Sequence, residues 1–318
     1  MIIQEIDFGP VLGASGVRGF FDEGYWFHKL MKPFGCNFEG CTFVAKTITL
    51  DPRVGNMPLK RDGMTPRELR PKCVVVKFRK GVVLNAVGLS GPGAQTFFRG
   101  HNRWQYQSKP FMLSFMSVAP IRESRMGELS AFVSLLDNCR SCFFAPFALQ
   151  INFSCPNVGL DPKHLVEEIR YSLDLTKPLV GIPIIPKYSV DTPPEVVVLV
   201  DKHEQCHGHC ISNTLPWRKI PEDLKMELFG TLESPLAEFG GGGLSGWPLL
   251  NQVCDWVAKA KDLGVKKPIN AGGGILHPDD VNLLKDAGAD SVFIGSVAIL
   301  RPWRVQSIIK RAHQVFGS

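Results

Sequence analysis

No apolar run in this chain approaches the ~20 consecutive residues that a membrane-spanning helix requires. The first ten residues, MIIQEIDFGP, carry two acidic side chains and lack the basic start and apolar core of a secretory signal peptide. We therefore expect a cytoplasmic protein with no membrane partner. Internal repeats, low-complexity tracts and linker-like segments are also missing, so the economical interpretation is one domain spanning residues 1–318.

The chain also lacks a basic tail. Its 36 Lys and Arg residues outnumber its 30 Asp and Glu residues, but the cations are spread along the whole sequence. That distribution argues against a nucleic-acid partner, and it suits an anionic small molecule equally well. The nine cysteines stand at irregular spacings, none of them typical of an iron–sulfur cluster, so we expect reduced thiols.

Eight short runs have the composition of buried parallel strands, because each begins with apolar residues and ends with polar residues or glycine. In a (β/α)8 barrel the lower parts of the strands fill the interior, and their C-terminal ends build the active site. The pattern therefore predicts an α/β fold of the (β/α)8, or TIM barrel, class. The runs are residues 11–16, 43–49, 111–117, 148–155, 181–189, 209–214, 267–274 and 291–296.

Helical periodicity falls between these strands, as a barrel requires. The predicted helices are residues 129–139, 161–175, 248–264 and 277–288. Pro278 in the first turn of the last helix and Gly288 after its end are the expected start and stop signals. An insertion at about 51–107 contains KCVVVKFRKGVVLN (72–85), which is typical of a β-hairpin, and we expect it to cover the C-terminal mouth of the barrel.

A phosphate site is predicted from Ile269 to Ser296. The order there is strand, glycine turn, helix, strand, and then Gly295 with Ser296. Glycines at 272–274 let the backbone approach an anion closely, and the second turn adds further N–H donors, as in the phosphate cradle after barrel strands seven and eight. This pattern suits FMN, a sugar phosphate or a pyridoxal phosphate, and it does not choose among them.

The segment NFSCPN (152–157) makes that choice. It resembles the motif of class 1 dihydroorotate dehydrogenases, in which the loop after the fourth strand carries a cysteine base between two substrate-binding asparagines. The resemblance extends from about Pro10 to Trp303. Its other segments are ASGV (14–17), AKTITLDPRVGN (45–56), LNAVGLSGPG (84–93), ISNT (211–214), GGLSG (242–246) and AGGGI (271–275).

This resemblance implies an FMN-dependent oxidation of dihydroorotate to orotate in pyrimidine biosynthesis. Cys155 is implied to be the base that removes the proton from C5, while a hydride leaves C6 for the flavin. A cysteine suits this role because its reference pKa of ~8.5 lies close to neutrality. Lys46 is implied to act in catalysis and in binding, near the flavin and the substrate carboxylate.

The resemblance also assigns the binding residues. The substrate contacts it implies are Lys46, Asn85, Gly88, Leu89, Asn152, Asn157, Asn213 and Thr214. The cofactor contacts it implies are Ala14, Ser15, Gly16, Lys46, Thr47, Asn152, Lys187, Ser212, Gly246, Gly273, Gly274, Gly295 and Ser296. Amides and hydroxyls suit a pyrimidine, because they match its alternating N–H and C=O groups.

One position departs from the family pattern. Within GLSGPG, Gly91 stands where the family usually has an asparagine. Two alternatives therefore stay open. The first is an FMN oxidoreductase that acts on another dihydropyrimidine or cyclic amide, and the second is a flavin-binding protein without catalysis. Because Cys155 and all four asparagines are present, the second alternative is the weaker one.

Two short segments are rich in cysteine or histidine. HEQCHGHC (203–210) and CRSC (139–142) suggest a zinc site, but we interpret them as polar loops with free thiols and expect no metal. Fumarate, or NAD through a partner subunit, stays open as the electron acceptor. The resemblance implies a homodimer, although the sequence indicates no interface.

Overall fold

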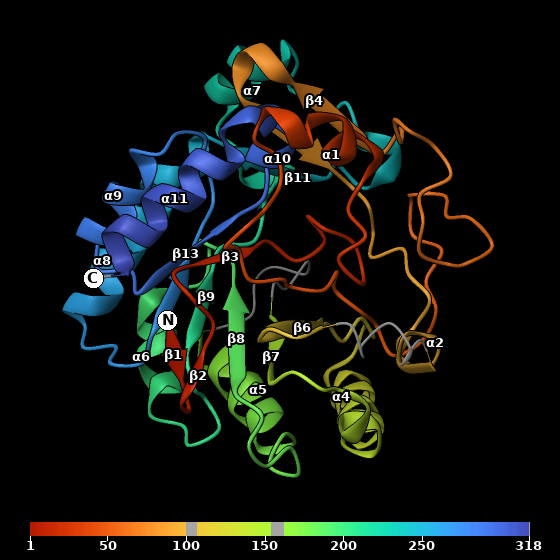
Figure 1. Cartoon of the computed structure of the whole chain (residues 1–318), viewed down its shortest axis with the longest axis vertical. Coiled ribbons are helices and arrows are strands. Elements are labelled where there is room, and N and C mark those ends of the chain that lie inside the picture. The colour runs from red at the N-terminus through yellow and green to blue at the C-terminus, as the bar shows by residue number, and fades with distance from the viewer. Residues whose placement is uncertain (100–106, 154–161, 318) are drawn as a thin grey trace.

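The computed structural model describes residues 1–99, 107–153 and 162–317. A seven-stranded parallel sheet curls into most of a barrel, in the order β3-β13-β12-β9-β8-β7-β6 (Figure 1). Its strands are β3 (Val11–Gly13), β6 (Phe111–Phe115), β7 (Phe147–Asn152), β8 (Ile184–Tyr188), β9 (His209–Ile211), β12 (Ile269–Ala271) and β13 (Ser291–Ile294). The predicted barrel class is thereby confirmed.

The predicted second strand, 43–49, is not a regular strand, which corrects that expectation. Its segment still closes the barrel, because Thr42 bridges Leu12 of β3 and Val44 bridges Met112 of β6, both in parallel. The backbone N–H groups of Ala45 and Ile48 donate to carbonyl oxygens only two residues apart on β6, each at 2.8 Å. The segment therefore carries one extra residue, as a β-bulge does, and bulges often redirect side chains near active sites.

The barrel interior is a closed apolar cluster. The inward side chains from its strands are Leu12, Met112, Ala148, Ile185, Cys210 and Phe293, joined by Val44 from the bulged segment. A short N-terminal hairpin, β1 (Ile2–Ile3) and β2 (Ile6–Asp7), places Ile3 and Phe8 in the same cluster. This hairpin precedes β3 directly, so it closes the N-terminal end of the barrel and leaves the opposite end for a site.

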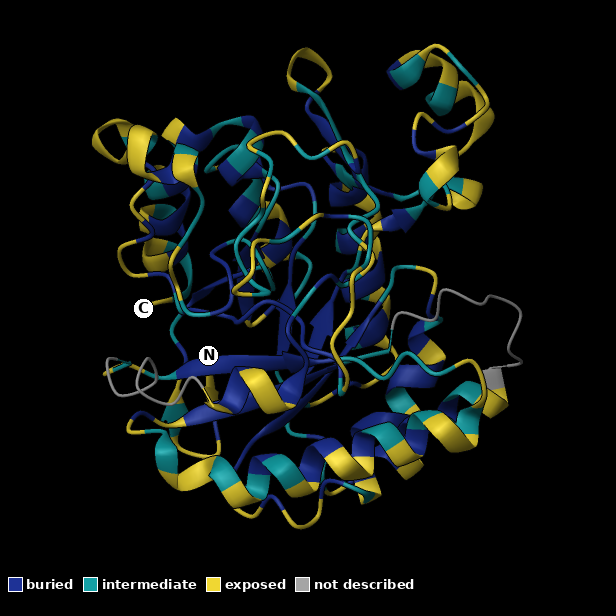
Figure 2. Cartoon of the chain, turned by 90° about the vertical axis from the view of Figure 1, so that its right-hand side faces the viewer, coloured by how far each residue is buried: buried dark blue, intermediate teal, exposed yellow. Residues whose placement is uncertain are grey.

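Helices surround the strands and bury a second, larger cluster against them. They are α4 (Arg122–Cys139), α5 (Pro162–Asp174), α6 (Pro194–Asp201), α8 (Pro248–Asp262), α9 (Asp280–Asp286) and α11 (Val305–Phe316). In α11 the buried residues are Val305, Ile308, Ile309 and Ala312, the spacing of one helix face. Figure 2 shows the strands buried at the centre and the exposed residues on the outer faces of the helices. Within the described ranges, no helix is long and apolar enough to cross a membrane.

A second sheet forms a lid beside the barrel mouth. This antiparallel sheet has the order β10-β11-β5-β4, and its strands are β4 (Val74–Lys77), β5 (Val82–Asn85), β10 (Leu215–Pro216) and β11 (Gly243–Gly246). The predicted hairpin at 72–85 is confirmed as β4 and β5, which pair from Val74 opposite Asn85 to Lys77 opposite Val82. The helix α7 (Glu222–Phe229) and the lid strands share a separate apolar cluster.

Three further short α-helices lie within the described ranges. They are α1 (Trp26–Met31), α2 (Ala94–Arg99) and α10 (Val297–Leu300). In Figure 1, α1 and α10 lie in the upper part of the view with the lid strands β4 and β11, and α4 and α5 lie in the lower part. The predicted insertion at 51–107 supplies only half of the lid sheet, because β10 and β11 come from a later segment that the sequence pattern did not assign to the lid.

Several predicted boundaries need correction. Helix α4 begins at Arg122, seven residues before the predicted start at 129, since its first two turns are polar and show no apolar period. Helix α9 begins at Asp280, so Pro278 precedes it. The strands β9 and β12 end at Ile211 and Ala271, before the polar ends of runs 209–214 and 267–274. Most of GGLSG (242–246) forms the lid strand β11.

Candidate active site

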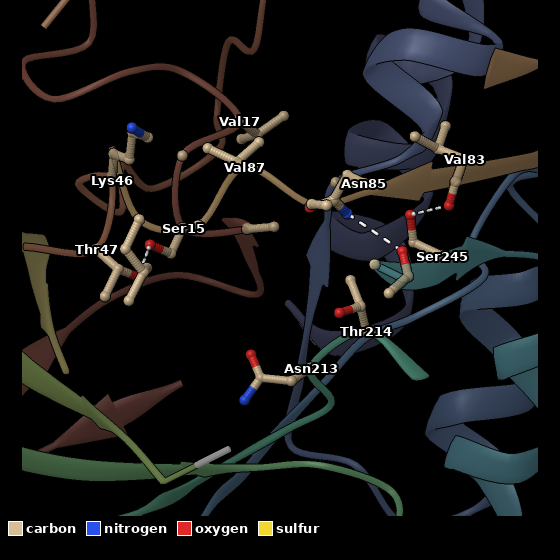
Figure 3. A pocket seen from close by; sticks show the side chains of 18 of the residues that line it. Ser15, Val17, Lys46, Thr47, Val83, Asn85, Val87, Asn213, Thr214 and Ser245 are labelled. Atoms are coloured by element: carbon tan, nitrogen blue, oxygen red, sulfur yellow. Dashed lines mark hydrogen bonds between the residues drawn. The ribbon is translucent and has the colours of Figure 1, made fainter. Parts of the chain in front are cut away.

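A large cavity opens at the C-terminal ends of the barrel strands and is bordered by the lid. Its volume is about 2130 Å³, larger than one drug-sized ligand requires. The predicted site residues that line it are Ala14, Ser15, Gly16, Lys46, Thr47, Asn85, Gly88, Leu89, Asn152, Lys187, Ser212, Asn213, Thr214, Gly273, Gly274, Gly295 and Ser296. Figure 3 shows Ser15, Lys46 and Thr47 on one side of the open space, with Asn85, Asn213 and Thr214 on the other.

Three predicted residues are not among that lining. Cys155 and Asn157 lie outside the described residues. Gly246 ends the lid strand β11, and its carbonyl oxygen is 3.0 Å from the position a Cβ would take on Gly274. Gly246 therefore supports the loop at Gly274 from behind.

Lys46 is a buried cation inside the bulge. Its Nζ donates to the carbonyl oxygen of Ser90 in the lid loop and lies 4.7 Å from the ring centroid of Phe20. Burial lowers the pKa of Lys46 to about 8, although Glu23 and Cys73 act in the opposite direction. Burial destabilises the charged form of this lysine. A bound anion would stabilise the charged form again and raise the pKa of Lys46.

Lys187 is the second buried cation, on β8. Its Nζ lies 4.9 Å from the ring centroid of Phe293, and in the described part of the chain it has no hydrogen-bond acceptor or carboxylate partner. Burial lowers its pKa, while Cys210 on the neighbouring strand acts against this shift. The barrel mouth thus contains two buried lysines whose positive charge an anionic ligand would balance.

The amides that the sequence singled out converge from separate elements. Asn213, after β9, donates from Nδ2 to Oδ1 of Asn152 at the end of β7, at 2.7 Å. Asn85, at the end of lid strand β5, donates weakly to the carbonyl oxygen of Gly243 at 3.4 Å. Thr214 follows Asn213 and is exposed to the cavity. A flat ring with N–H and C=O groups on its edges can exchange hydrogen bonds with such a set.

A series of hydrogen-bonded hydroxyls links the loop after β3, the bulged segment and β6. Ser15 and Thr47 hydroxyls lie 2.8 Å apart, and Thr47 and Ser114 hydroxyls lie 2.9 Å apart. Ser15 also donates to the carbonyl oxygen of Ala45 at 2.9 Å. Ser114 was not among the predicted residues, although its polar side chain in the otherwise apolar run 111–115 was a usable signal. These hydrogen bonds hold the side chain of Thr47 in place, and they thereby stabilise the bulge.

The glycine turns after β12 and β13 form an anion cradle. Within the described residues, the backbone N–H groups of Gly273, Gly274, Gly295 and Ser296 have no hydrogen-bond acceptor. Gly273 and Gly274 have φ of +137° and +85°, which side chains rarely adopt, and a Cβ on Gly295 would lie 2.9 Å from that of Ala14. These backbone N–H groups are free to donate, and the absence of side chains lets an anion approach them closely. Both features fit a phosphate group.

The family of this chain follows from its similarity to known proteins. The family model described as "Dihydroorotate dehydrogenase" matches residues 7–316. The chain belongs to the dihydroorotate dehydrogenase family.

Individual relatives agree with that assignment. The chain is 26% identical to a protein of Streptococcus pneumoniae named "Dihydroorotate dehydrogenase B (NAD(+)), catalytic subunit", over 96% of this chain and 88% of the relative. A protein of the same name from a Geobacillus species is 29% identical, over 94% and 84%.

Solved structures extend the likeness to the fold. A ligand-free dihydroorotate dehydrogenase from Eimeria tenella superposes with a TM-score of 0.69 and 18% identity, over 100% of this chain and 87% of that chain. The same enzyme in complex with ferulenol gives a TM-score of 0.68, over 99% and 83%.

The departure from the dihydroorotate dehydrogenase pattern at Gly91 has a structural reason. Gly91 forms an antiparallel bridge with Arg53, with N–O distances of 2.9 and 3.0 Å. A Cβ on Gly91 would lie 3.1 Å from Cζ of Phe20, the fully buried ring beneath Lys46. A side chain here would therefore press on the ring that supports Lys46.

The histidines and cysteines of 203–210 take other roles in this family member. His209 is fully buried, with Nε2 2.9 Å from Oδ1 of Asp201 and Nδ1 3.3 Å from the Tyr188 hydroxyl. His207 accepts a hydrogen bond from the backbone N–H of Ile184 at 2.9 Å. Across the described ranges, no group of three or more potential ligands is placed to hold a metal ion.

Proposed function

We propose that this member of the dihydroorotate dehydrogenase family oxidises dihydroorotate to orotate in pyrimidine biosynthesis, with FMN as its cofactor. One observation carries the proposal: two buried lysines, three asparagine amides and a cradle of free N–H donors line a single cavity at the barrel mouth. The family assignment and the names of the relatives support the same substrate.

The cofactor site is assigned from the cradle outward. Gly273, Gly274, Gly295 and Ser296 would hold the FMN phosphate through their free N–H groups. The rest of the FMN molecule would contact Ala14, Ser15, Gly16, Thr47, Asn152, Lys187 and Ser212. Gly246 would support the cradle from behind. Bound FMN supplies a two-electron acceptor, which no side chain can provide.

The substrate would lie between the bulge and the lid. Lys46 would face its carboxylate, and Asn85, Asn152, Asn213 and Thr214 would bind the ring edges. Asn157, Gly88 and Leu89 complete this set. Cys155 would remove the C5 proton, and it follows Asn152 by three residues in the sequence. Lys46 is buried, so its charge interactions are stronger than in solvent.

The final electron acceptor is proposed from the relatives. Their names give NAD(+) and describe a catalytic subunit, so we propose NAD, reached through a partner subunit, in preference to fumarate. Purified chain alone should then reduce an artificial dye but neither NAD nor fumarate. Direct turnover with fumarate would overturn this choice.

An absorption spectrum followed by one anaerobic addition tests the central proposal. The purified protein should show the flavin bands, and dihydroorotate should bleach them. Dihydrouracil and dihydrothymine serve as controls for the alternative of another dihydropyrimidine substrate, and they should leave the bands unchanged. Bleaching by either control without bleaching by dihydroorotate would refute the proposed substrate.

The organisation of the protein is proposed on the same basis. We infer one domain over residues 1–318, a homodimer as the catalytic unit, and a cytoplasmic location without a nucleic-acid or membrane partner. Light scattering on a sizing column would give the mass of the assembly. A monomer at micromolar concentration would contradict the dimer.

A further inference from the structure

A second concave region lies where the tip of the lid hairpin meets the barrel. We call it the tip pocket. Its volume is about 370 Å³, and its walls are residues 79–81 of the hairpin tip, Trp247, Leu250, Gly274, Leu276, His277, Asp280 and Arg301. Gly274 lines both this pocket and the main cavity, so the two regions share a wall. None of the family site residues predicted above other than Gly274 belongs to it.

The tip pocket has uncompensated positive charge. Arg79, Lys80 and Arg301 come from two separate segments, and within the described residues none of the three side chains forms an ion pair or a hydrogen bond. The single carboxylate in the lining is that of Asp280. Its Oδ2 already accepts from the backbone N–H groups of Leu276 and His277, at 2.7 and 2.8 Å. Three cations facing one concave space favour an anionic ligand.

Trp247 gives the same pocket an aromatic wall. Its side chain is 45% exposed, and its Nε1 donates to the carbonyl oxygen of Lys80 at 2.8 Å. Cδ1 of the ring lies 3.2 Å from the position that a Cβ would take on Gly81. The indole is therefore held against the hairpin tip by a hydrogen bond and by packing, while part of its surface stays open for stacking.

We propose that the tip pocket binds a nucleotide, with its phosphates on Arg79, Lys80 and Arg301 and its base against Trp247. The pocket volume lies within the range of small-ligand sites, roughly 300–1,000 Å³. Because Arg79 and Lys80 belong to the lid and Arg301 to the barrel, the bound phosphates tie the lid hairpin to the barrel. The hairpin also carries Asn85, so occupancy of the tip pocket is coupled to the main cavity.

Titration calorimetry on FMN-loaded protein tests the proposal. The probes are uridine 5′-diphosphate, adenosine 5′-diphosphate and inorganic pyrophosphate, each against four proteins. These are the natural chain, Arg79→Gln with Lys80→Gln, Arg301→Gln, and a matched control with Lys202→Gln and Lys310→Gln. A fifth protein, Trp247→Ala, is titrated with the same probes. The control removes two exposed lysines that make no described side-chain contact.

We expect saturable nucleotide binding to the natural chain and the control, and affinity at least tenfold weaker in both tip-pocket variants. Trp247→Ala should weaken nucleotide binding about tenfold and leave pyrophosphate binding unchanged. Absence of saturable binding at 10 mM nucleotide, or equal affinity in the tip-pocket variants, would refute the proposal. Pyrophosphate binding as tightly as nucleotide would refute the role of the base.

Hydrogen exchange gives a second readout that does not depend on turnover. Nucleotide should slow amide exchange at residues 78–81 at least threefold, with no change in helix α4, which lies far from the tip pocket in sequence and packs on other strands. Unchanged exchange at the hairpin tip under saturating nucleotide would contradict the tie between lid and barrel. Because neither measurement uses dihydroorotate, failure here is distinct from failure of the proposed function.

Discussion

Lys46 shows how one side chain combines structure and chemistry. The bulge turns it into the cavity, Phe20 packs beneath its Nζ, and the Ser90 carbonyl oxygen accepts its hydrogen bond. Burial lowers its pKa to about 8, which means that the free site holds a cation poised near physiological pH. A carboxylate at this point would recover much of the electrostatic stabilisation that burial removes.

The affinity for orotate should depend on pH through this lysine. Lys46 is protonated below about pH 8 and neutral above it, and only the cation attracts the carboxylate. The dissociation constant should therefore rise by roughly fivefold between pH 8 and pH 9, and little between pH 6.5 and pH 7.5. Fluorescence titration measures it. Below pH 8, Lys46→Met should bind orotate more weakly than the natural chain, and its affinity should lose this pH dependence. An identical pH profile in that variant would assign the titration elsewhere.

Cys155 is proposed as the base, and its removal should affect one step only. Cys155→Ala should keep FMN and bind orotate, while the anaerobic rate of flavin reduction by dihydroorotate falls by ~10² or more, the usual contribution of a general base. Stopped-flow absorbance measures that rate. Cys206→Ala changes a buried thiol elsewhere in the fold and serves as the control. Normal reduction in Cys155→Ala would mean that another group takes the proton.

Gly91 tests whether a family departure alters substrate choice or only packing. Restoring the asparagine, Gly91→Asn, should lower the free energy of unfolding by about 1–3 kcal/mol, because the new Cβ presses on Phe20. Selectivity for dihydroorotate over dihydrouracil should not change. Urea unfolding gives the first quantity and steady-state assays the second. Gly127→Asn, at a position with nothing within 4 Å and no positive φ, is the control.

At the scale of elements, function depends on backbone that leaves the sheet. The strands β12 and β13 end at Ala271 and Ile294, and the glycines that follow point free N–H groups into one cradle. The bulge does the same for Lys46 and Thr47. In each case an apolar strand provides a rigid support. Where its hydrogen bonding to the neighbouring strand stops or is interrupted, polar groups face the cavity.

Filling the cradle should remove the cofactor without unfolding the barrel. Gly295→Val places a side chain against Ala14, where a Cβ already lies at 2.9 Å, and it should lower FMN retention after gel filtration at least tenfold. The ratio of flavin to protein absorbance measures this. Gly127→Val in α4, which has no neighbour within 4 Å, should keep full flavin content. Full retention in Gly295→Val would place the phosphate elsewhere.

At the scale of the whole molecule, one buried network ties the barrel wall to an outer helix. His209 of β9 contacts Asp201 at the end of α6, and Asp201 also accepts from the backbone N–H groups of Lys266 and Lys267. Burial opposes charge on His209, but Cys206 and Asp201 outweigh it and raise its pKa to about 9. Burial likewise opposes charge on Asp201, yet these hydrogen bonds lower its pKa to about 2.

This network should make stability fall as the solution becomes basic. Because the pKa of His209 is higher in the folded chain than its usual 6.5, its contribution is complete below pH 6.5 and is lost as pH rises toward 9. The free energy of unfolding should drop by about 2 kcal/mol between pH 6.5 and pH 8. Urea unfolding at several pH values measures it. The exposed control His164→Gln should keep this slope and His209→Gln should lose it; equal slopes would contradict the assignment.

Much of this protein could be predicted from local chemistry. Apolar runs with polar ends predicted the barrel, because a strand of this kind buries its lower part and presents its end at the mouth. The hairpin at 72–85 and the cradle at Gly273 and Gly295 were also visible, since turns and anion sites need glycine at particular places. The motif around Asn152 indicated the family, which the comparison confirmed.

The tertiary structure decided what depends on contacts between distant segments. The bulge that turns Lys46 inward arises from pairing with β6, and the second half of the lid comes from strands β10 and β11, far along the chain. The lowered pKa of Lys46 and the raised pKa of His209 follow from burial and neighbours that no single segment contains. Local sequence thus determined which elements form and which side chains end them, whereas packing determined how those side chains are charged and what they face.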